Sequence, residues 1–458
     1  MQFTAIILAG GKGTRMNSAL PKPLHAVGGR PMLAWSMDAA KAAGATAIIT
    51  VLGPDTGAIQ SWLDGAPFVS QQDQRGTGDA VVAARDMLAG EDGIALVMFA
   101  DNPLVSAATL QEMARRVQAG ASIAVGAFHA ENPAGYGRVV TDADGTVLRI
   151  VEDRDSNAAE RRITLCNGGI MAVRIPLLFD LLSQVTNDNT KGEYYLTDIT
   201  GIAAEHGHKI DCAVIDPTEF IGVDSRHGQA RAETALQARL RHAALDAGVT
   251  MQAPDTVFLA ADAVIERDVI IEPNVIIGSG CHIGEGSIIR AFSHLEGARV
   301  GACCIVGPFA RLRPGTDAAE GVKIGNFVEI KNARLDAGAK ANHLAYIGDA
   351  EIGREANIGA GTITCNYDGF GKYRTLIGEG SFIGSNTALV APVSIGARAI
   401  VGAGSTITSD VDDDSIAMTR VDQQERSGAA VSFREKKLRK NSPKRAESRW
   451  TPNRRQRR

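Results

Sequence analysis

A six-residue period runs through the second half of the chain, from about residue 264 to residue 411. Glycine follows the recurring aliphatic residue in many units, as in Ile283-Gly284 and Ile395-Gly396. The two clearest series are Ile265, Ile271, Ile277, Ile283, Ile289 and Leu295, and Ile377, Ile383, Leu389, Ile395, Val401 and Ile407. This period fits neither an amphipathic helix nor an alternating strand. It predicts a parallel β-helix whose aliphatic side chains stack inside successive coils.

The main alternative to a β-helix is a β-sandwich with chance spacing, which six consecutive matches in each of two blocks disfavour. The period fails between about residues 312 and 346, and again at 365–376. Repeats are interrupted where loops leave the coil, often on the binding face. We therefore expect a site at these breaks, which carry most of the polar residues of the tract: Arg313, Lys331, His343, Tyr346, Asn357, Asn366 and Tyr367.

The first half of the chain alternates buried strands with helices. We expect strands at 3–8, 47–52, 94–99, 122–128 and 170–174, and helices at 32–43, 77–88 and 107–119. This alternation predicts a Rossmann-like α/β domain with a largely parallel sheet. A helix without Pro or Gly, expected at 229–247, would then join this domain to the β-helix as a spacer, with Gly248 at its end.

Ligands of parallel sheets bind beyond the carboxyl ends of the strands. Two segments stand there: the glycine-rich stretch Leu8–Met16, which follows the first strand, and Asp101, which follows the strand at 94–99. Closely spaced glycines let backbone N–H groups approach a phosphate, although this stretch has neither Rossmann nor Walker spacing. The plainer alternatives are an ordinary strand-to-helix turn and, for Asp101, a helix N-cap.

Composition limits the remaining classes. The chain has 458 residues and a net charge of −4, but residues 434–458 carry 12 Lys and Arg against two Glu, so the body is acidic. The six cysteines have no zinc or disulfide spacing, and the N-terminus shows no signal or long apolar run, so we expect a cytoplasmic protein without a membrane segment. The basic tail with its single Trp450 is thin support for nucleic acid, which is not an expected partner.

The first half carries a set of motifs that resembles the sugar-phosphate nucleotidylyltransferases. They are Leu8–Arg15, Leu20–Leu24, Gln71, Gly76–Gly78, Asp101–Leu104, Gly135–Arg138, Val151-Glu152, Asn167–Gly169 and Gly192–Asp198. The second half resembles the hexapeptide-repeat transferases, whose β-helices are left-handed and whose chains form trimers. Its stretches Lys340–Asp349 and Asn357–Gly369 are similar to acetyltransferase motifs.

Together the halves resemble the bacterial enzyme family that acetylates glucosamine-1-phosphate with acetyl-CoA and then transfers UMP from UTP to N-acetylglucosamine-1-phosphate. The resemblance implies UDP-N-acetylglucosamine synthesis for peptidoglycan and lipopolysaccharide, with these small molecules as partners and a homotrimer. The expected division is 1–228 uridylyltransferase, 229–248 arm helix, 249–420 acetyltransferase and 421–458 basic tail.

For uridylyl transfer, the resemblance implies that a set of loop residues holds the nucleotide and the sugar. They are Leu8, Ala9, Gly10, Gly11, Arg15, Lys22, Gln71, Gly76, Thr77, Gly137, Glu152, Asn167 and Asp224. It also implies Mg²⁺ bound by Asp101 and Asp224. Hard carboxylate oxygens suit this ion, and its charge helps two anions to meet.

For acetyl transfer, an amine that attacks a thioester needs a base, and the resemblance assigns that role to His343. Taken alone, a single histidine is more often structural. The implied sugar-phosphate residues are Arg313, Lys331, Tyr346 and Asn357. Those implied for acetyl-CoA are Ala360, Asn366, Tyr367, Ser385, Ala403 and Arg420.

The chain departs from the family pattern at several positions. Phe99-Ala100 stands for the usual Tyr-Gly, Gly168 for Thr, Asp224 for Asn, and Asp422 for a common Pro. Two other functions are considered: a single nucleotidylyltransferase site with a structural or regulatory β-helix, and a non-enzymatic scaffold. The polar residues at Lys331, His343 and Asn366-Tyr367 argue against the first, because a β-helix that is only a scaffold has no need of them.

Overall fold

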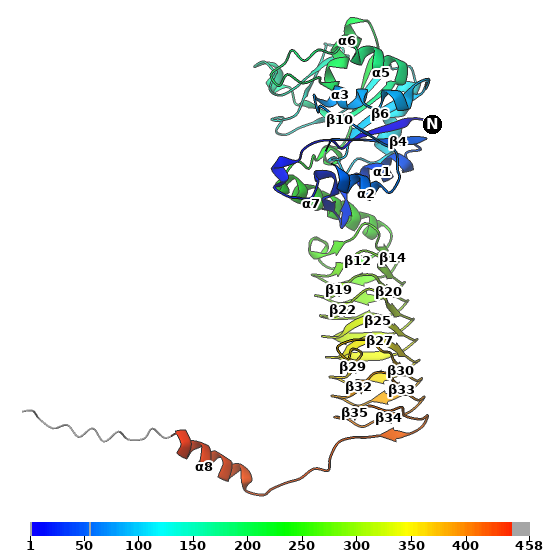
Figure 1. Ribbon diagram of the computed structural model, residues 1–458, viewed down its shortest axis with the longest axis vertical. Coiled ribbons are helices and arrows are strands. Elements are labelled where there is room, and N and C mark those ends of the chain that lie inside the picture. The colour runs from blue at the N-terminus through cyan, green and yellow to red at the C-terminus, as the bar shows by residue number, and fades with distance from the viewer. Residues whose placement is uncertain (1, 55, 442–458) are drawn as a thin grey trace, which may run out of the picture.

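A computed structural model describes residues 2–54 and 56–441 of the chain. A globular N-terminal half stands on a long column of stacked strands, and one helix, α7 (Arg226–Asp246), crosses the junction between them (Figure 1). Residues 442–458, which include Trp450 and most of the basic tail, lie outside the described residues. Within the described ranges, no helix combines the length and apolarity needed to cross a bilayer.

The N-terminal half is built on a twisted α/β sheet, as predicted. Its strand order is β11-β7-β10-β6-β1-β4-β5, and only β10 runs antiparallel along this path. The strands are β1 (Thr4–Leu8), β4 (Ala47–Leu52), β5 (Phe68–Ser70), β6 (Ile94–Phe99), β7 (Ile123–His129), β10 (Leu165–Arg174) and β11 (Ile210–Val214), with a hairpin of β8 (Arg138–Thr141) and β9 (Val147–Val151) beside β10. Because β1 and β6 are adjacent and parallel, their carboxyl ends place the glycine-rich stretch next to Asp101.

Helices pack on the sheet and bury its two faces in separate apolar clusters. They are α1 (Met32–Ala42), α2 (Gly57–Leu63), α3 (Thr77–Val82), α4 (Ala107–Gln118), α5 (Ile175–Leu182) and α6 (Ile199–Glu205). The helix predicted at 77–88 is wrong in part, because α3 ends at Val82 and a separate 3₁₀ turn covers Arg85–Leu88.

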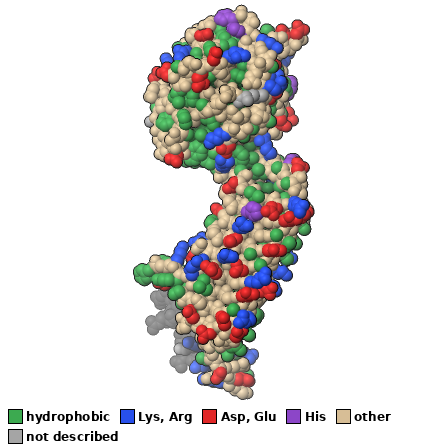
Figure 2. Space-filling view, turned by 90° about the vertical axis from the view of Figure 1, so that its right-hand side faces the viewer, with side chains coloured by type: hydrophobic (Ala, Val, Ile, Leu, Met, Phe, Trp, Pro, Cys, Tyr) green, Lys and Arg blue, Asp and Glu red, His purple; other side chains and the backbone are tan. Residues whose placement is uncertain are grey.

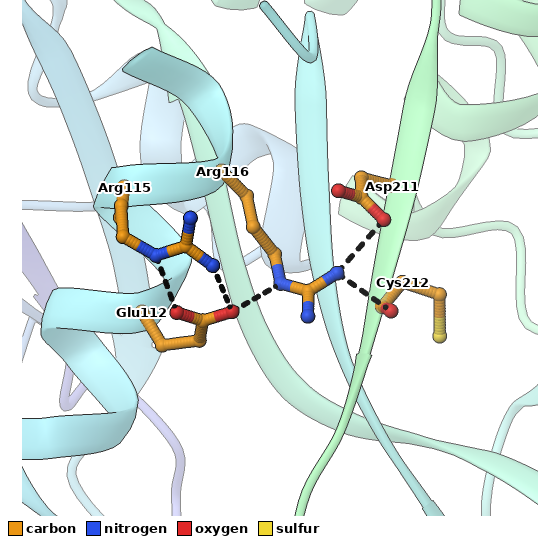
Figure 3. Close-up of polar contacts among 5 residues, drawn as sticks. All are labelled: Glu112, Arg115, Arg116, Asp211 and Cys212. Carbon is orange, nitrogen blue, oxygen red and sulfur yellow. Dashed lines mark hydrogen bonds and ion pairs between the residues drawn. The ribbon is translucent and has the colours of Figure 1, made fainter. Parts of the chain in front are cut away.

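An ion-pair network fixes α4 to the edge strand β11 (Figure 3). Glu112 accepts hydrogen bonds from both Arg115 and Arg116, and Arg116 reaches on to Asp211 and to the carbonyl oxygen of Cys212. The hydrogen bond from Arg115, with Arg116 beside it, lowers the pKa of Glu112 to about 2. This carboxylate therefore stays charged over the physiological range.

The second half is the parallel β-helix that the six-residue period predicted, and it is left-handed, as the family resemblance implied. Its first face contains β12 (Thr250–Met251), β15 (Ile270–Ile271), β18 (Ile288–Ile289), β21 (Ile305–Val306), β24 (Lys323–Asn326), β26 (Lys340–His343), β28 (Asn357–Ile358), β31 (Phe382–Ile383), β34 (Ile400–Val401) and β36 (Ile416–Ala417). The repeating residues from Ile271 to Leu295 and from Ile383 to Ile407 are buried in its core.

The other two faces are joined where the long strands β25 (Glu329–Leu335) and β27 (Tyr346–Ile352) run through their common corner. The second face adds β13 (Phe258–Leu259), β16 (Ile276–Ile277), β19 (His294–Leu295), β22 (Arg311–Leu312), β29 (Ile363–Cys365), β32 (Ala388–Val390) and β35 (Thr406–Ile407). The third adds β14 (Val264–Ile265), β17 (His282–Ile283), β20 (Ala298–Val300), β23 (Thr316–Ala318), β30 (Thr375–Ile377) and β33 (Val393–Ile395).

The loop expected between residues 312 and 346 is wrong, because the coils continue there in register. Arg311 pairs with Glu329, and Glu329 pairs with Tyr346 only 17 positions later. A coil of 17 residues instead of 18 moves the aliphatic residue by one place, which breaks a count by six without opening the coil. The break at 365–376 is a real loop: Ile363 pairs with Ala388, 25 positions on, and Phe370 at the tip is 97% exposed.

The helix α7 begins at Arg226, three residues earlier than predicted, because the Ser225 side chain caps it by accepting from the backbone N–H of Gly228. It ends at Asp246, and Gly248, just beyond the C-cap, has a φ of 92°, a conformation that glycine adopts easily. At the other end of the column, residues 418–428 lead away to an exposed basic helix, α8 (Ala429–Asn441) (Figure 1).

Candidate active sites

A cavity of about 900 Å³ opens at the carboxyl end of the N-terminal sheet. Eight of the predicted uridylyltransferase residues line it: Arg15, Lys22, Thr77, Asp101, Gly137, Glu152, Asn167 and Asp224. They come from loops far apart in sequence, which the parallel strands bring to one edge. Six others are not among its lining residues: Leu8, Ala9, Gly10, Gly11, Gln71 and Gly76.

Those remaining residues form a second group beside the cavity. Gly10 packs so closely on the next loop that a Cβ there would lie 3.1 Å from the backbone N of Gly53 and 3.6 Å from Oε1 of Gln71. The buried Gln71 donates from Nε2 to the carbonyl oxygen of Gly76 at 2.9 Å, and Thr77 accepts from the backbone N–H of Leu196. The glycine-rich stretch, Gln71 and Gly76 are therefore in contact as one structural unit.

Two ion pairs hold the carboxylates that were predicted to bind metal. Nη1 of Arg15 lies 2.6 Å from Oδ2 of Asp224, and the ammonium group of Lys22 contacts Asp101. The described residues contain no cluster of three His, Cys, Asp or Glu side chains suited to a metal. Two carboxylates completed by phosphate oxygens and water are, however, the donor set that Mg²⁺ takes in nucleotide sites, so the residues present fit this ion.

Beside Glu152, which lines the cavity, the structure places two residues that sequence reasoning did not single out. Thr197, which lines the cavity, donates to Oε1 of Glu152 at 3.0 Å, and Asp198 follows it. Burial raises the pKa of Glu152. Burial, with the charges of Glu152 and Asp155, also raises the pKa of Asp198 to about 6. The motif Gly192–Asp198 had been noticed, but only the fold places its last residues against Glu152.

We expect Asp198→Asn to stabilise the N-terminal half at pH 7.5. The folded pKa of about 6 lies above the ordinary 3.8, so the folded state loses stability as pH rises through this window. The full shift would amount to about 3 kcal/mol, but this half-exposed group is screened by solvent, which leaves about 1 kcal/mol. The gain should appear as a higher melting temperature at pH 7.5 and should shrink at pH 4.5. An equal gain at both pH values would contradict this explanation.

Two of the departures from the family pattern, Phe99 and Gly168, lie in the wall of the cavity. A Cβ at Gly168 would lie 2.5 Å from the ring of Phe220, so the ring fills the space that a threonine side chain would need. Phe220 in turn packs on Phe128 with ring centroids 5.5 Å apart. Phe99 lies against Gly169, and all of these residues line the cavity. Phe220 carried no sequence signal, because its importance depends on the missing side chain at Gly168.

In the β-helix, His343 ends strand β26 at the corner between the first and second faces. Its Nδ1 lies 2.7 Å from Oδ1 of Asn326, the equivalent residue of the preceding coil. A cavity of about 570 Å³ opens beside His343 and is lined also by Arg290, Phe309 and Lys323. If the amide oxygen accepts from Nδ1–H, Nε2 is left free to accept a proton.

Residues predicted for acetyl-CoA stack along this same corner in later coils. The carbonyl oxygen of Ala360 accepts from Asn386, that of Ser385 from Gly404, and that of Ala403 from Nη1 of Arg420 at 3.1 Å. This corner of the β-helix thus contains His343, Ala360, Ser385, Ala403 and Arg420. The replacement of Pro by Asp422 leaves this contact of Arg420 in place.

The other six predicted acetyltransferase residues lie outside the cavity beside His343. Arg313 and Lys331 lie at the corner between the second and third faces, where Nη1 of Arg313 pairs with Glu329 at 2.8 Å. Lys331 lies beside Lys372 of the projecting loop, whose ammonium group lowers the pKa of Lys331. Asn366 and Tyr367 begin that loop, and Tyr346 and Asn357 begin strands of the second and first faces. None of these six residues lines the 570 Å³ cavity.

Comparisons with known proteins match both halves. Residues 5–162 match the MobA-like NTP transferase domain, and residues 262–297 and 374–409 match the bacterial transferase hexapeptide (six repeats). Similar relatives named bifunctional protein GlmU occur in Acidiphilium cryptum (52% identical, covering 95% of this chain and 99% of the relative) and Bradyrhizobium sp. (50%, 95% and 98%). Another from Sphingopyxis alaskensis is 49% identical (94% and 96%). The chain therefore belongs to the GlmU family of bifunctional proteins, with a nucleotidyltransferase half and a hexapeptide-repeat acetyltransferase half.

Proposed function

We propose that this bifunctional transferase makes UDP-N-acetylglucosamine in two steps. The β-helix half acetylates glucosamine-1-phosphate with acetyl-CoA, and the N-terminal half transfers UMP from UTP to N-acetylglucosamine-1-phosphate and releases pyrophosphate. One observation carries the second step: two carboxylates and two cations, Asp101, Asp224, Arg15 and Lys22, converge on one cavity at the carboxyl end of the sheet. Both steps use substrates of the cytoplasm, and the six cysteines are free, so we place the enzyme there.

The test is to incubate the pure protein with glucosamine-1-phosphate, acetyl-CoA, UTP and Mg²⁺ and to measure products as each substrate is omitted. We expect UDP-N-acetylglucosamine from the complete mixture. Without acetyl-CoA it should form only when N-acetylglucosamine-1-phosphate is supplied. Product formation limited to the second step would favour the single-site alternative.

In uridylyl transfer, the protein mainly brings two anions together in line. Arg15 and Lys22 attract the triphosphate, the stretch Leu8–Gly11 offers backbone N–H groups, and Gln71 with Gly76 and Thr77 reads the base. Gly137, Glu152 and Asn167 hold the sugar. Mg²⁺, held by Asp101 and Asp224, would supply charge that neutralises the phosphates. When these ligands arrive, each ion pair between a cation and a carboxylate must separate.

In acetyl transfer, His343 takes the proton of the attacking amine, and Asn326 holds its ring in the tautomer that leaves Nε2 free. Arg313 and Lys331 would bind the phosphate, together with Tyr346 and Asn357. Acetyl-CoA would lie along the column of Ala360, Ser385, Ala403 and Arg420, and be reached by Asn366 and Tyr367.

Arg313 and Lys331 lie at one corner of the prism-shaped β-helix, and His343, Ala360, Ser385, Ala403 and Arg420 lie at another, so the site is completed between chains. When one corner of a copy meets a different corner of the next, the contact is heterologous and closes into a ring. The resemblance to trimeric relatives sets the ring size at three.

An apolar column at the His343 corner supports this assembly. Phe292, Phe309, Phe327 and Leu344 occupy equivalent corners of successive coils and are 45–60% exposed. The three rings stack with centroids 4.9 and 5.2 Å apart. All four have φ between 51° and 61°, which costs a non-glycine residue about 1 kcal/mol or more. The face of the β-helix drawn in Figure 2 carries mixed charges with apolar residues between them. A corner covered by another copy explains why these four residues stand in one row.

A further inference from the structure

The first turn of α7 is in contact with the segments that line the uridylyltransferase cavity. Arg226 opens this helix two residues after Asp224. Its Nε donates to the carbonyl oxygen of Met16 at 3.2 Å, and Nη1 lies 3.1 Å from Nδ1 of His25. Met16 directly follows Arg15, and His25 ends the short turn that begins with Lys22. Of the charged cavity residues Arg15, Lys22, Asp101 and Asp224, three therefore lie on segments that this one guanidinium group connects.

His25 is a fixed acceptor for this contact. The side chain is buried, and burial with the charge of Arg226 lowers its pKa, so the ring is neutral. With Nδ1 accepting from Arg226, the proton sits on Nε2, which is buried without a hydrogen bond of ordinary geometry among the described residues. The ring also interacts with the backbone of Leu20, and the bond from Arg226 is the contact that ties it to α7.

The following turns of α7 hold the same segment from the side. Nε2 of Gln229 donates to the carbonyl oxygen of Ala26 at 2.8 Å, and Glu233 accepts from the backbone N–H of Gly28 at 2.6 Å. Gln229 also accepts from Nη1 of Arg226 at 3.0 Å. Leu236 packs with Met16 and Val27 in one buried cluster. The helix α7, which was expected to be a spacer, therefore also packs against the N-terminal half.

We propose that Arg226 is a positioning residue for uridylyl transfer, an inference that rests on the proposed function. By linking Met16 and His25 to the start of α7, it fixes Arg15 and Lys22 relative to Asp224. The two cations must bind the nucleotide while the two carboxylates hold its metal. The distance between the cations and the carboxylates must therefore suit both ligands. A misplacement of about 1 Å in such a site costs about 100-fold in rate.

The test compares Arg226→Ala, Arg226→Lys and Arg239→Ala in the full-length protein. Arg239 lies on the same helix and donates to the carbonyl oxygen of Leu104, but it is not among the residues that line the cavity, so it is the matched control. Steady-state kinetics should show a kcat about 10- to 100-fold lower for Arg226→Ala, with acetyl transfer unchanged. Arg226→Lys should recover part of the loss, because an ammonium group can still bond one acceptor. Arg239→Ala should keep its kcat.

A second readout does not depend on turnover. Mn²⁺ titrated in the presence of UTP and followed by electron paramagnetic resonance should bind more weakly to Arg226→Ala and normally to Arg239→Ala. Normal kcat and Mn²⁺ affinity in Arg226→Ala would overturn the proposal, as would equal losses in Arg239→Ala. If the wild-type protein makes no UDP-N-acetylglucosamine, the proposed function fails, while the Mn²⁺ comparison still tests the role of Arg226. If Arg226→Ala does not fold, Arg226→Gln takes its place under the same criteria.

Discussion

We expect His343→Ala to lose acetyl transfer and to keep uridylyl transfer. The amine of glucosamine-1-phosphate must lose a proton as it attacks the thioester, and a positioned base contributes about 10²- to 10⁴-fold. We expect a loss of that size in the rate of acetyl-CoA consumption. Uridylyl transfer should be unchanged when N-acetylglucosamine-1-phosphate is supplied directly. The reason is that His343 belongs to the β-helix and lies away from the cavity of the N-terminal half (Figure 1).

The reciprocal variant is Asp101→Ala, which should lose uridylyl transfer and keep acetyl transfer. The pair of variants forms its own control, since each is assayed for both reactions. Normal acetylation by His343→Ala would show that another group is the base. Asn326→Ala should have a smaller effect than His343→Ala, because it removes the orientation of the ring and not the base itself. Loss of both activities in one folded variant would contradict the presence of two independent sites.

We expect the double variant Phe309→Asp/Phe327→Asp to separate the proposed trimer into single chains and to lose acetyl transfer. Charges in the apolar column would be buried without partners if copies met there, at a cost of several kcal/mol. Light scattering should give the mass of one chain, and acetyl transfer should fall by at least 100-fold, because Arg313 and Lys331 no longer reach His343. Uridylyl transfer should be unchanged.

The backbone at these corners makes the variant informative. Aspartate tolerates positive φ better than phenylalanine, so the substitutions should not weaken the coil itself. Leu148→Asp, which changes a similarly exposed residue of the N-terminal half, is the control for added charge. A double variant that stays a trimer, or a single chain that acetylates normally, would be incompatible with a site completed between chains.

The sequence predicted the parts of this structure that follow from local patterning. The strands at 47–52 and 94–99 have the predicted bounds, because a continuous apolar run buried on both faces has few other solutions. The β-helix followed from a period that no other regular structure has. The residue roles rest on the resemblance, and they stay predictions.

What could not be predicted depends on contacts between distant segments. A coil of 17 residues stacks on its neighbours as well as one of 18. Counting by six therefore predicted a loop at 312–346 where the coils continue. The position of Thr197 against Glu152 and of Phe220 beneath Gly168 arises only when loops meet at the sheet edge. His343 and Lys331 are separated because they lie at different corners of the β-helix. The spacing of residues along the sequence does not show which corner each one occupies.

The two ends of the β-helix are covered differently. At the first coil, α7 closes the stack: Leu240 and Ala244 pack on its core, and Gln237 exchanges hydrogen bonds with the backbone of Leu259. At the last coil, Ile416 and Met418 are 71% and 55% exposed. Each coil is stabilised only by its neighbours, and the last coil has a neighbour on one side only. Local unfolding of the β-helix should therefore begin at this uncovered end. The row of Ala360, Ser385, Ala403 and Arg420, which we propose for acetyl-CoA, therefore ends in the coil that opens most easily.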